Sequence, residues 1–581
     1  MSLLKNLKSA NSLHDVAHLL GYEPKALAYI LYKKSNLTKY SQFSIPKRTG
    51  GKRLISAPYP QLKTLQKRLS NLLQHCIVEI NSAREIKSVL SHGFRLKYSI
   101  MTNGAIHKNR RYVFNIDLSD FFGTINFGRV RGFFITNRNF NLKPKVATVL
   151  AQICCHDNCL PQGSPCSPVI SNLIGHILDI RLSSLSNQTG CTYSRYADDL
   201  TFSTNKRNFP IKIAKCINKK THEWGTGSQL EKIISKSGFK INRTKTRMQY
   251  TNSRQDVTGL VVNSKVNTRA EYRHLARSMV HRLLKTGSFQ RKKITFDEDG
   301  NPIESIVNGT LAQLNGILSF IDSVSVFNLK IGVKASEKEK PLKKSDHPDC
   351  NEKVYRLFLL YKNFYAPIKP LILCEGKTDN IYIKSAIKSL LKYYPNLVGK
   401  NKSKKIEFKL DFFQRNATTG RILGLTGGTG ELLNLIQMYK VESKYLAAPC
   451  RKQPVILLID NDKGAKGLFS YVSGITKSKI DKKDSFIYVT DNIYIIPTPL
   501  TSSGGDTMIE DFFDKKLLKS KLGVKTLNLS DKGFDSKKEY GKNHFAKYVI
   551  KKNEKTIDFT GFKPLLDRIE EVIRDYKKRI I

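Results

Sequence analysis

The pattern of apolar and polar residues predicts helices and short strands in the first two thirds of the chain. Apolar residues recur at helical spacing within residues 1–44, and again within residues 61–80, where they define an amphipathic helix. Between these segments, residues 45–58 predict a hairpin, because a Gly-Gly turn separates two runs of strand-forming residues. Residues 112–122 contain an apolar strand that ends in an acid, and residues 269–321 return to helical spacing, now rich in Arg and Lys. This part of the chain therefore mixes helices and strands.

The pattern changes at Pro370. Leu371–Cys374 and Val455–Ile459 are continuous apolar runs, and each is followed at once by an acid, Glu375 and Asp460 respectively. Continuous apolar strands indicate a parallel sheet that is covered on both faces. In such a sheet the functional site lies at the carboxyl ends of the strands. We therefore expect acids from separate strands to converge at one edge of the sheet.

Two adjacent carboxylates, Asp198 and Asp199, lie between an aromatic residue and a strand-forming run. Successive side chains of a strand point to opposite faces, so a tight hairpin at the pair is needed to present both carboxylates together. Paired carboxylates repel each other unless a cation lies between them, and oxygen ligands of this kind suit Mg²⁺. An isolated pair is more often an ordinary acidic turn, so the interpretation depends on the motifs around it.

The excess of basic over acidic residues indicates what kind of partner the protein binds. The chain has 581 residues, enough for several domains, and holds 99 Lys and Arg against 48 Asp and Glu, a formal net charge of +51. Such an excess indicates a polyanionic partner, and nucleic acid is the natural candidate. A basic protein of membrane surfaces is the alternative, but we find no lipidation motif, no long apolar span and no signal-peptide core. We expect a cytoplasmic protein with no membrane partner.

The cysteines give no sign of a disulfide scaffold, because ten in 581 residues are too few. Four of them cluster with His156 between residues 154 and 166. Their spacing does not fit the paired Cys-x-x-Cys arms of zinc sites, so we interpret them as buried thiols.

Three motifs occur in order along the first part of the chain. An apolar strand ends at Asp117, Pro161-Gln162-Gly163 precedes an apolar helix pattern, and Tyr196-Ala197-Asp198-Asp199 follows. This order resembles the reverse transcriptases of the retron type, and the triplet Val257-Thr258-Gly259 is typical of that family. The segment Asn-Ala-x-x-His, which the family also carries, is not found in clear form.

The resemblance implies an α+β right-hand polymerase with fingers, palm and a helical thumb. Strand extension needs a 3′-hydroxyl activated and a pyrophosphate stabilised, and two Mg²⁺ ions do both. The expected catalytic residues and metal ligands are Asp117, Asp198 and Asp199. The expected nucleotide-binding residues are Lys52 and Arg53 at the hairpin, the backbone at Leu118, Phe122 under the sugar, Gln162, and Lys245 as proton donor to pyrophosphate. The expected RNA-binding residues are Val257, Thr258 and Gly259.

The second part of the chain resembles another family. Glu375-Gly376-Lys377-Thr378-Asp379, followed by Asp460-Asn461-Asp462, is similar to the Toprim domain of topoisomerases, primases and a class of nucleases. The resemblance implies an α/β domain with a parallel sheet and one or two Mg²⁺ ions, and Mn²⁺ suits the same ligands at both sites. The expected catalytic metal ligands are Glu375, Asp460 and Asp462, and the expected supporting ligands are Asp379, Glu510 and Asp511.

Phosphodiester cleavage is the favoured reaction of this domain. A topoisomerase would need a further domain with an attacking Tyr, and a primase would repeat the chemistry of the first part. A structural domain that does not use its acids is the alternative.

We therefore expect a two-part enzyme. The predicted domains are an N-terminal helical extension over residues 1–44, fingers and palm over 45–255, an RNA-recognition region and thumb over 256–366, and a Toprim domain with a basic C-terminal tail over 367–581. The family resemblance implies that the enzyme uses dNTPs to copy a cognate structured non-coding RNA into a branched, RNA-linked single-stranded DNA (msDNA). It further implies a bacterial anti-phage role, in which the Toprim domain cuts a nucleic-acid target and the chain self-associates with msDNA.

Two other functions remain open. A group II intron-like maturase is the first, although the Toprim acids argue against it. A basic nucleic-acid-binding protein with inactive acidic sites is the second.

Overall fold

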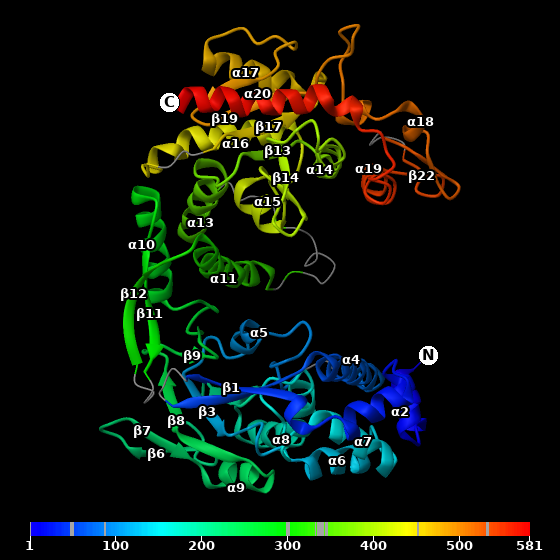
Figure 1. Ribbon diagram of the computed structural model, residues 1–581. Coiled ribbons are helices and arrows are strands. Elements are labelled where there is room, and N and C mark those ends of the chain that lie inside the picture. The colour runs from blue at the N-terminus through cyan, green and yellow to red at the C-terminus, as the bar shows by residue number, and fades with distance from the viewer. Residues whose placement is uncertain are drawn as a thin grey trace. The chain divides into compact units, whose positions relative to one another are not determined.

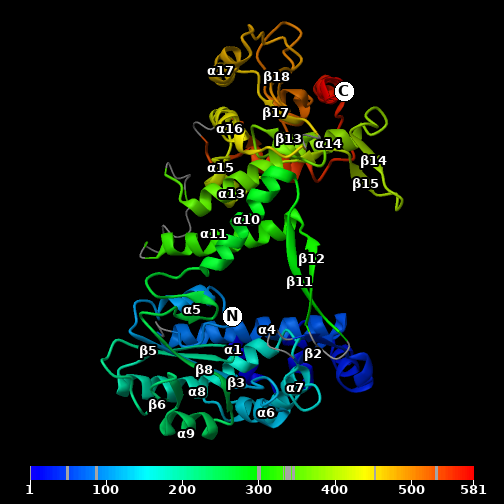
Figure 2. The ribbon, with the colours of Figure 1, turned by 90° about the vertical axis from the view of Figure 1, so that its left-hand side faces the viewer.

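The computed structural model describes residues 2–46, 51–85, 89–297, 302–331, 347–449, 453–529 and 534–580, together with residues 333 and 342. The chain divides into two compact units, which are described separately below (Figures 1 and 2). The first unit comprises residues 1–272, 292–306 and 323–331, and the second comprises residues 273–291, 307–322 and 332–581. Among the described residues, no helix combines the length and the apolar character that crossing a membrane requires.

The first unit is built on a four-stranded antiparallel sheet. Its strands lie in the order β4 (Thr192–Tyr196), β5 (Asp199–Thr204), β3 (Tyr112–Ser119) and β8 (Lys240–Tyr250). The central strand β3 is buried along almost its whole length, which explains its continuous apolar sequence. The apolar strand predicted around Asp117 is confirmed.

Helices cover this sheet and share one core with it. The main ones are α4 (Pro60–Ala83), α6 (Phe127–Thr136), α7 (Pro144–Cys154), α8 (Ser167–Thr189) and α9 (Ser228–Lys236). In α4 the leucines at helical spacing are buried, which confirms the amphipathic helix predicted over residues 61–80. The shorter helices are α1 (Leu3–Ser9), α2 (Leu13–Leu19), α3 (Pro24–Ala28), η1 (Tyr29–Lys33), η2 (Asn36–Thr38) and α5 (Ile100–Ala105).

Two predictions about this region need correction. The N-terminal extension is helical only as far as Thr38, because β1 (Tyr40–Pro46) pairs with β2 (Lys52–Pro58) in a hairpin longer than predicted. Residues 47–50, which include the first glycine of the predicted turn, lie outside the described residues.

The second correction concerns residues 269–321. Instead of helix throughout, a hairpin of β11 (Gln290–Phe296) and β12 (Pro302–Asn308) separates α10 (Ala270–Thr286) from α11 (Leu311–Lys330). The β-branched and aromatic residues of both strands favour pairing over helix. Two other two-stranded hairpins are β6 (Ala214–Asn218) with β7 (Glu223–Thr226), and β9 (Asp256–Val257) with β10 (Leu260–Val261).

The second unit is built on a five-stranded, mainly parallel sheet. Its order is β16 (Asp411–Phe412), β13 (Leu371–Cys374), β17 (Val455–Ile459), β19 (Ile493–Pro497) and β18 (Ile487–Thr490). β13 pairs in parallel with both β16 and β17, and β17 with β19, while β18 is antiparallel to β19. β13, β17 and β19 are buried at every position, in agreement with their continuous apolar sequences.

Helices surround this sheet, and their bounds are α13 (Cys350–Leu360), η3 (Tyr361–Tyr365), α14 (Asp379–Ser389), α15 (Ala417–Leu423), α16 (Thr429–Glu442), η4 (Ser443–Tyr445), η5 (Lys463–Ala465), α17 (Lys466–Thr476), η6 (Ile509–Phe512), α18 (Lys515–Leu518), α19 (Lys542–His544), η7 (Phe545–Ile550), η8 (Thr560–Phe562) and α20 (Lys563–Ile580). The small strands are β14 (Val398–Lys400), β15 (Ile406–Phe408), β20 (Lys521–Leu522), β21 (Lys525–Leu527) and β22 (Glu539–Tyr540). The basic C-terminal segment ends in α20, whose apolar face lies in the same core as β13 and β17.

Candidate functional site

Three aspartates of the first unit meet at one end of its sheet. Asp117 lies near the end of β3, and Asp199, the first residue of β5, is its direct partner in the antiparallel pairing. Asp198 lies in the turn between β4 and β5, where Ala197 takes a left-handed backbone conformation with φ of +55°. The backbone N–H of Leu118 donates to the Asp198 carbonyl oxygen at 3.0 Å and ties this turn to β3. The turn thereby presents the adjacent carboxylates beside Asp117.

Side chains of β8 hold both oxygens of the Asp117 carboxylate. Asn242 Nδ2 donates to Oδ2 at 3.1 Å, and Lys245 Nζ donates to Oδ1 at 3.0 Å. The carboxylate is almost fully buried, whereas the lysine is half exposed. Lys245 therefore supplies positive charge at the position where the sequence predicts a metal ion.

The electrostatics of the three acids favour a bound cation. Burial and then repulsion from Asp117 raise the pKa of Asp198, against the opposing effects of Lys245 and Arg53. Asp199 is an exposed residue, but the protein packed around its carboxylate, followed by repulsion from Asp198 and Asp117, raises its pKa to about 6. Such a cluster of oxygen ligands suits a hard divalent cation, which would relieve the repulsion.

The fit of a metal ion has one structural condition. Among the residues that the structure describes, no three carboxylate, thiol or imidazole groups lie close enough together to form a ready-made metal site. In the first unit, the Lys245 ammonium already pairs with Asp117 Oδ1. An ion bound by this oxygen would therefore compete with the Lys245 ammonium.

The predicted nucleotide-binding hairpin is docked on the loop before α8. Lys52 and Arg53 lie exposed on β2, and Arg53 is close enough to Asp198 to act on its pKa. The carbonyl oxygen of Gln162 accepts a hydrogen bond from Ser56 N–H of β2 at 2.8 Å. At the next residue, Gly163, φ is +127° and a Cβ would lie 2.7 Å from the Ser56 carbonyl oxygen. Glycine is therefore required for this close approach.

Phe122 and Leu118 differ in what they offer to a substrate. Phe122 is half-buried, with its ring centroid 5.6 Å from that of Phe121 and 6.2 Å from that of Phe94. The Leu118 side chain is in the core, and its backbone N–H is already bonded to Asp198. The structure therefore does not offer this N–H to a triphosphate, and a contact of the triphosphate with the rest of the backbone around Leu118 stays a prediction.

The Val-Thr-Gly triplet forms the turn between β9 and β10, beside the aspartates. Thr258 and Gly259 both have positive φ and line a pocket of about 220 Å³ together with Asp117 and Asp199. Val257 is fully buried and packs in one small cluster with two other valines, so its side chain is not available to RNA. Of the three residues, only the two at the turn stay candidates for nucleic-acid contact.

Sequence reasoning missed a buried network behind the catalytic turn. His107 contacts the hydroxyls of Ser203 at 2.7 Å and Ser194 at 2.8 Å, and Ser194 donates to Asn103 Oδ1 at 2.7 Å. Asn103 and His107 have the spacing of Asn-Ala-x-x-His, with Gly104 in the alanine position. A Cβ at Gly104 would lie 3.2 Å from a Val262 methyl carbon, which accounts for glycine there. The segment is therefore present, with glycine in place of its alanine.

A second acidic site lies at the carboxyl ends of β13 and β17. Glu375 directly follows β13, where its Oε1 accepts from Thr429 Oγ1 at 2.6 Å and its Oε2 accepts from the Asp460 backbone N–H at 3.2 Å. Asp460 directly follows β17, and its Oδ1 accepts from Ile509 N–H at 2.9 Å. The two acids predicted to converge at this edge of the sheet therefore do so.

Two further acids complete this cluster. Asp379 begins α14 and accepts a hydrogen bond from Gly376 N–H at 2.7 Å, and burial raises its pKa. Glu510 is fully buried in η6 and pairs with Lys542 at 3.2 Å. Burial, followed by repulsion from Asp379, Glu375 and Glu510, raises the pKa of Asp460 to about 8. A cation would relieve this repulsion as well.

The other two predicted acids each accept a local backbone hydrogen bond. Asp462 Oδ1 accepts from Gly464 N–H at 2.7 Å and caps η5. Asp511 is exposed and accepts from Met508 N–H at 2.7 Å. Their part in the acidic cluster stays a prediction. Lys542 is the residue of this site that sequence reasoning missed, since one lysine among many carries no pattern.

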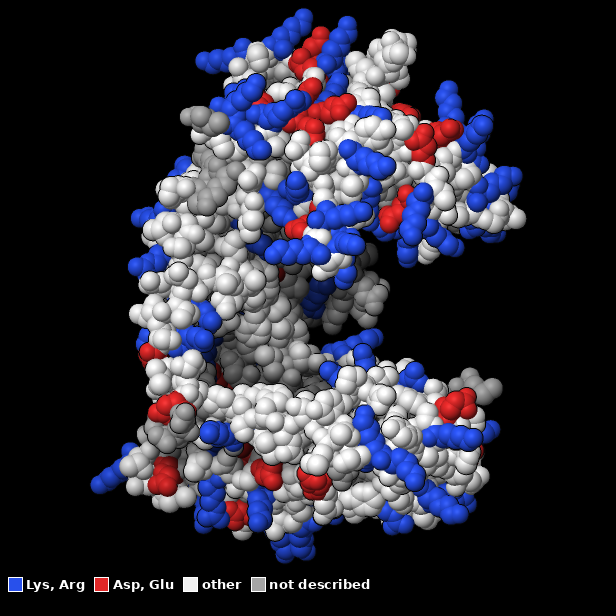
Figure 3. All heavy atoms as spheres, in the orientation of Figure 1, with Lys and Arg blue, Asp and Glu red and all other residues white. Residues whose placement is uncertain are grey.

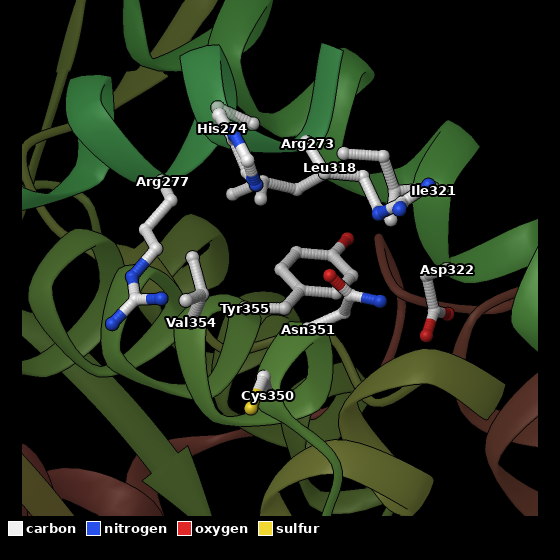
Figure 4. A pocket seen from close by; sticks show the side chains of 11 residues that line it. Arg273, His274, Arg277, Leu318, Ile321, Asp322, Cys350, Asn351, Val354 and Tyr355 are labelled. Carbon is white, nitrogen blue, oxygen red and sulfur yellow. The ribbon is translucent and has the colours of Figure 1, made fainter. Parts of the chain in front are cut away.

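A pocket of about 230 Å³ in the second unit has a different character. It is lined by α10, α11 and α13, and Figure 4 shows Arg273, His274 and Arg277 of α10 opposite Tyr355 and Asn351 of α13. The one carboxylate in its lining, Asp322, is paired with Arg421. The pocket is basic and lacks the paired acids of the two sites above. On the face in Figure 3, Lys and Arg cover both units more densely than Asp and Glu.

Comparison with known proteins agrees with the geometry of the first unit. Residues 45–296 match the family described as "Reverse transcriptase (RNA-dependent DNA polymerase)", so this part of the chain has the reverse transcriptase polymerase fold. Retron Ec86 reverse transcriptase of Escherichia coli is 31% identical over 276 residues, which are 47% of this chain and 78% of that protein. The chain therefore belongs to the retron-type reverse transcriptases.

Other relatives match over a smaller share of their length. Retron Mx162 and Mx65 reverse transcriptases of Myxococcus xanthus are 32% and 33% identical, over 54% and 46% of this chain. The chain spans 64% and 62% of these two proteins, just under two thirds. Telomerase structures from Candida tropicalis and Candida albicans align with TM-scores of 0.25 and 0.29, at 17% and 10% identity. The aligned residues make up 41% and 70% of this chain, and 56% and 65% of the two telomerase chains. We base no argument on these low scores.

Proposed function

We propose that the first unit is an RNA-directed DNA polymerase, which copies a cognate structured RNA into msDNA from dNTPs. The observation that carries this proposal is the meeting of Asp117, Asp198 and Asp199 at one end of the sheet, in a chain of the retron family. The raised pKa values of Asp198 and Asp199 indicate a site made for a cation.

Each part of the site has a role in this reaction. The three carboxylates would hold two Mg²⁺ ions, which activate the 3′-hydroxyl and stabilise the pyrophosphate when bound. Lys245 keeps Asp117 neutralised in their absence and, once displaced, is free to give a proton to pyrophosphate. Arg53 and Lys52 bring positive charge to the triphosphate from β2, and Phe122 excludes a 2′-hydroxyl from beneath the sugar.

Primer extension tests this proposal directly. The purified chain, given an RNA template, a DNA primer and dNTPs with Mg²⁺, should add nucleotides, and the Asp198→Asn/Asp199→Asn variant should not. Asp511→Asn is the matched control, because it removes a carboxylate of the second unit. Extension by the double variant at the wild-type rate would contradict the proposal.

We also propose that residues 367–581, which belong to the second unit, form a Toprim-type, metal-dependent nuclease that acts in anti-phage defence. The supporting observation is the cluster of Glu375, Asp379, Asp460 and Glu510 at the carboxyl ends of parallel strands. The acids would hold one or two Mg²⁺ or Mn²⁺ ions, which would supply the activated water when bound, and Lys542 would bring positive charge to the phosphodiester.

The nuclease proposal has a separate test. The chain should cut DNA or RNA in Mg²⁺ or Mn²⁺, Glu375→Gln should abolish cutting, and Asp511→Asn should leave it intact. Cutting that survives Glu375→Gln at the wild-type rate would contradict the proposal. Association of the chain with its own msDNA, which would restrain the nuclease, is measured by light scattering of the purified complex.

A further inference from the structure

The Ser91–Phe94 segment has no role in the sites above, yet it is bound closely to the catalytic turn. The N–H of His92 donates to the carbonyl oxygen of Arg195 at 2.8 Å. Gly93 approaches so closely that a Cβ at this position would lie 2.6 Å from Ala197 N. A larger residue would push the turn away, so the segment and the turn move as one body.

A buried ion pair holds this body from the other side. Arg195 is completely buried and binds Asp179 through two hydrogen bonds of 2.7 and 2.8 Å. Its Nη1 also donates to the carbonyl oxygen of Ala197 at 3.1 Å. A Cβ at Gly175 would lie 2.9 Å from the guanidinium, so glycine leaves the room for this arrangement. The position of Phe94, at the end of the segment, is therefore fixed relative to the catalytic turn.

Phe94 itself is strained and exposed. Its φ is +56°, a left-handed conformation that bulky side chains rarely adopt, and 41% of the residue is accessible to solvent. Burial in a core therefore does not offset the strain. The ring centroid lies 6.2 Å from that of Phe122 and 6.4 Å from that of Tyr196. Such strain persists where the surrounding structure imposes it, and it clusters at functional sites.

We propose that Phe94 is a nucleotide-contacting residue, which forms with Phe122 an aromatic wall against the sugar of the incoming deoxynucleotide. This inference rests on the proposed polymerase function. Phe122 is the residue expected under the sugar, and Tyr196 directly precedes the catalytic turn. A partly exposed ring beside both lies where the sugar of the nucleotide passes, and its rigid support keeps it there without a substrate. Phe94 then shares the exclusion of a 2′-hydroxyl with Phe122.

Single-nucleotide incorporation by the purified full chain on a DNA primer paired to RNA tests this role. Phe94→Leu keeps an apolar side chain but removes the ring. We expect KM for dNTP to rise about 5- to 30-fold, in the range of a lost aromatic contact to a nucleotide, with a smaller change in kcat. Discrimination against ribonucleotides should weaken. Phe94→Tyr should restore KM to within about 2-fold of the wild type.

Two further variants separate substrate contact from structure. Leu96→Ala is the matched control, because Leu96 is an exposed apolar residue two positions away, and its KM should stay unchanged. Phe94→Gly accommodates the left-handed backbone, so it should melt no lower than Phe94→Leu while its KM is raised at least as much.

The outcomes are distinct. A rise in KM for dNTP with Phe94→Leu, absent in Phe94→Tyr and Leu96→Ala, supports the proposal. Unchanged KM and unchanged ribonucleotide discrimination overturn it while the polymerase function stands. A defect confined to the Kd for primer–template also overturns it, because the ring would then contact the primer. A wild-type chain that extends no primer removes both the proposed function and this inference.

Discussion

Replacing Asp460 by Asn should stabilise the second unit at alkaline pH in the absence of metal ions. Burial and repulsion from three neighbouring acids raise the pKa of Asp460 to about 8, whereas an aspartate in the unfolded chain has a value near 3.8. Between about pH 4 and pH 8 the folded state therefore keeps a proton that the unfolded state has already lost. The free energy of unfolding should fall through this window, and above pH 8 the penalty is constant.

The size of the effect follows from the pKa difference. At 1.36 kcal/mol for each pH unit, a rise from 3.8 to about 8 sets an upper bound of about 6 kcal/mol. Partial contact with solvent and relaxation of the cluster reduce this, and we expect about 2 kcal/mol at pH 8.5. Asn has nearly the same shape and still accepts the hydrogen bond from Ile509 N–H. The difference between the two proteins should shrink as the pH falls toward 4, because the unfolded aspartate then becomes protonated as well.

The assay is calorimetric melting of the full chain in EDTA between pH 4.5 and 8.5, with amide hydrogen exchange of β17 to report on the second unit. Asp511→Asn is the control, because this exposed carboxylate lies outside the repelling cluster. Excess Mg²⁺ at pH 8 should raise the melting temperature of the wild type and change Asp460→Asn little. Equal pH dependence of the wild type and Asp460→Asn would refute the reasoning.

Three further predictions concern the polymerase site. Because the pKa of Asp199 is raised to about 6, primer extension should weaken as the pH falls from 7 to 5, and more Mg²⁺ should move the midpoint of the pH–rate profile lower; a flat profile to pH 5 would contradict this. Gly163→Ala places a Cβ against the Ser56 carbonyl oxygen and should displace the β1–β2 hairpin. Steady-state kinetics should then give a KM for dNTP that is raised about 10-fold or more. An unchanged KM would argue against the docking of the hairpin on the loop before α8. Arg195→Met leaves Asp179 buried without its cationic partner, so chemical denaturation should show a free energy of unfolding lower by about 3–5 kcal/mol. The double variant Arg195→Met/Asp179→Leu should recover most of this free energy. No recovery would mean that loss of the ion pair is not the cause.

The sequence predicts those residues whose positions depend on neighbours in the chain. Asp117 follows an apolar run long enough for a buried central strand, and Asp198 and Asp199 need a tight turn to be presented together. Glu375 and Asp460 end buried strands, and parallel pairing then brings them to one edge of the sheet. In each case the apolar pattern of the strand and the position of the acid along it predict where the carboxylate lies.

Residues placed by long-range packing could not be predicted in this way. Nothing in the sequence near Glu510 tells that this acid is fully buried beside Asp460, because burial of η6 depends on packing against distant parts of the chain. Lys542 reaches Glu510 from far along the chain. The tight contact of Gly93 with Ala197 is likewise invisible in the sequence, since it depends on two segments that meet only in the fold.

The most direct test of the account is the nucleic acid that the chain makes in cells. The chain should be expressed with the DNA upstream of its gene, and the nucleic acid should then be extracted from the purified protein and treated with RNase or DNase before denaturing electrophoresis. We predict a short DNA joined covalently to RNA, absent in the Asp198→Asn/Asp199→Asn variant and present in Asp511→Asn. Recovery of only unmodified cellular RNA from all three proteins would contradict the proposal that this chain is a retron polymerase.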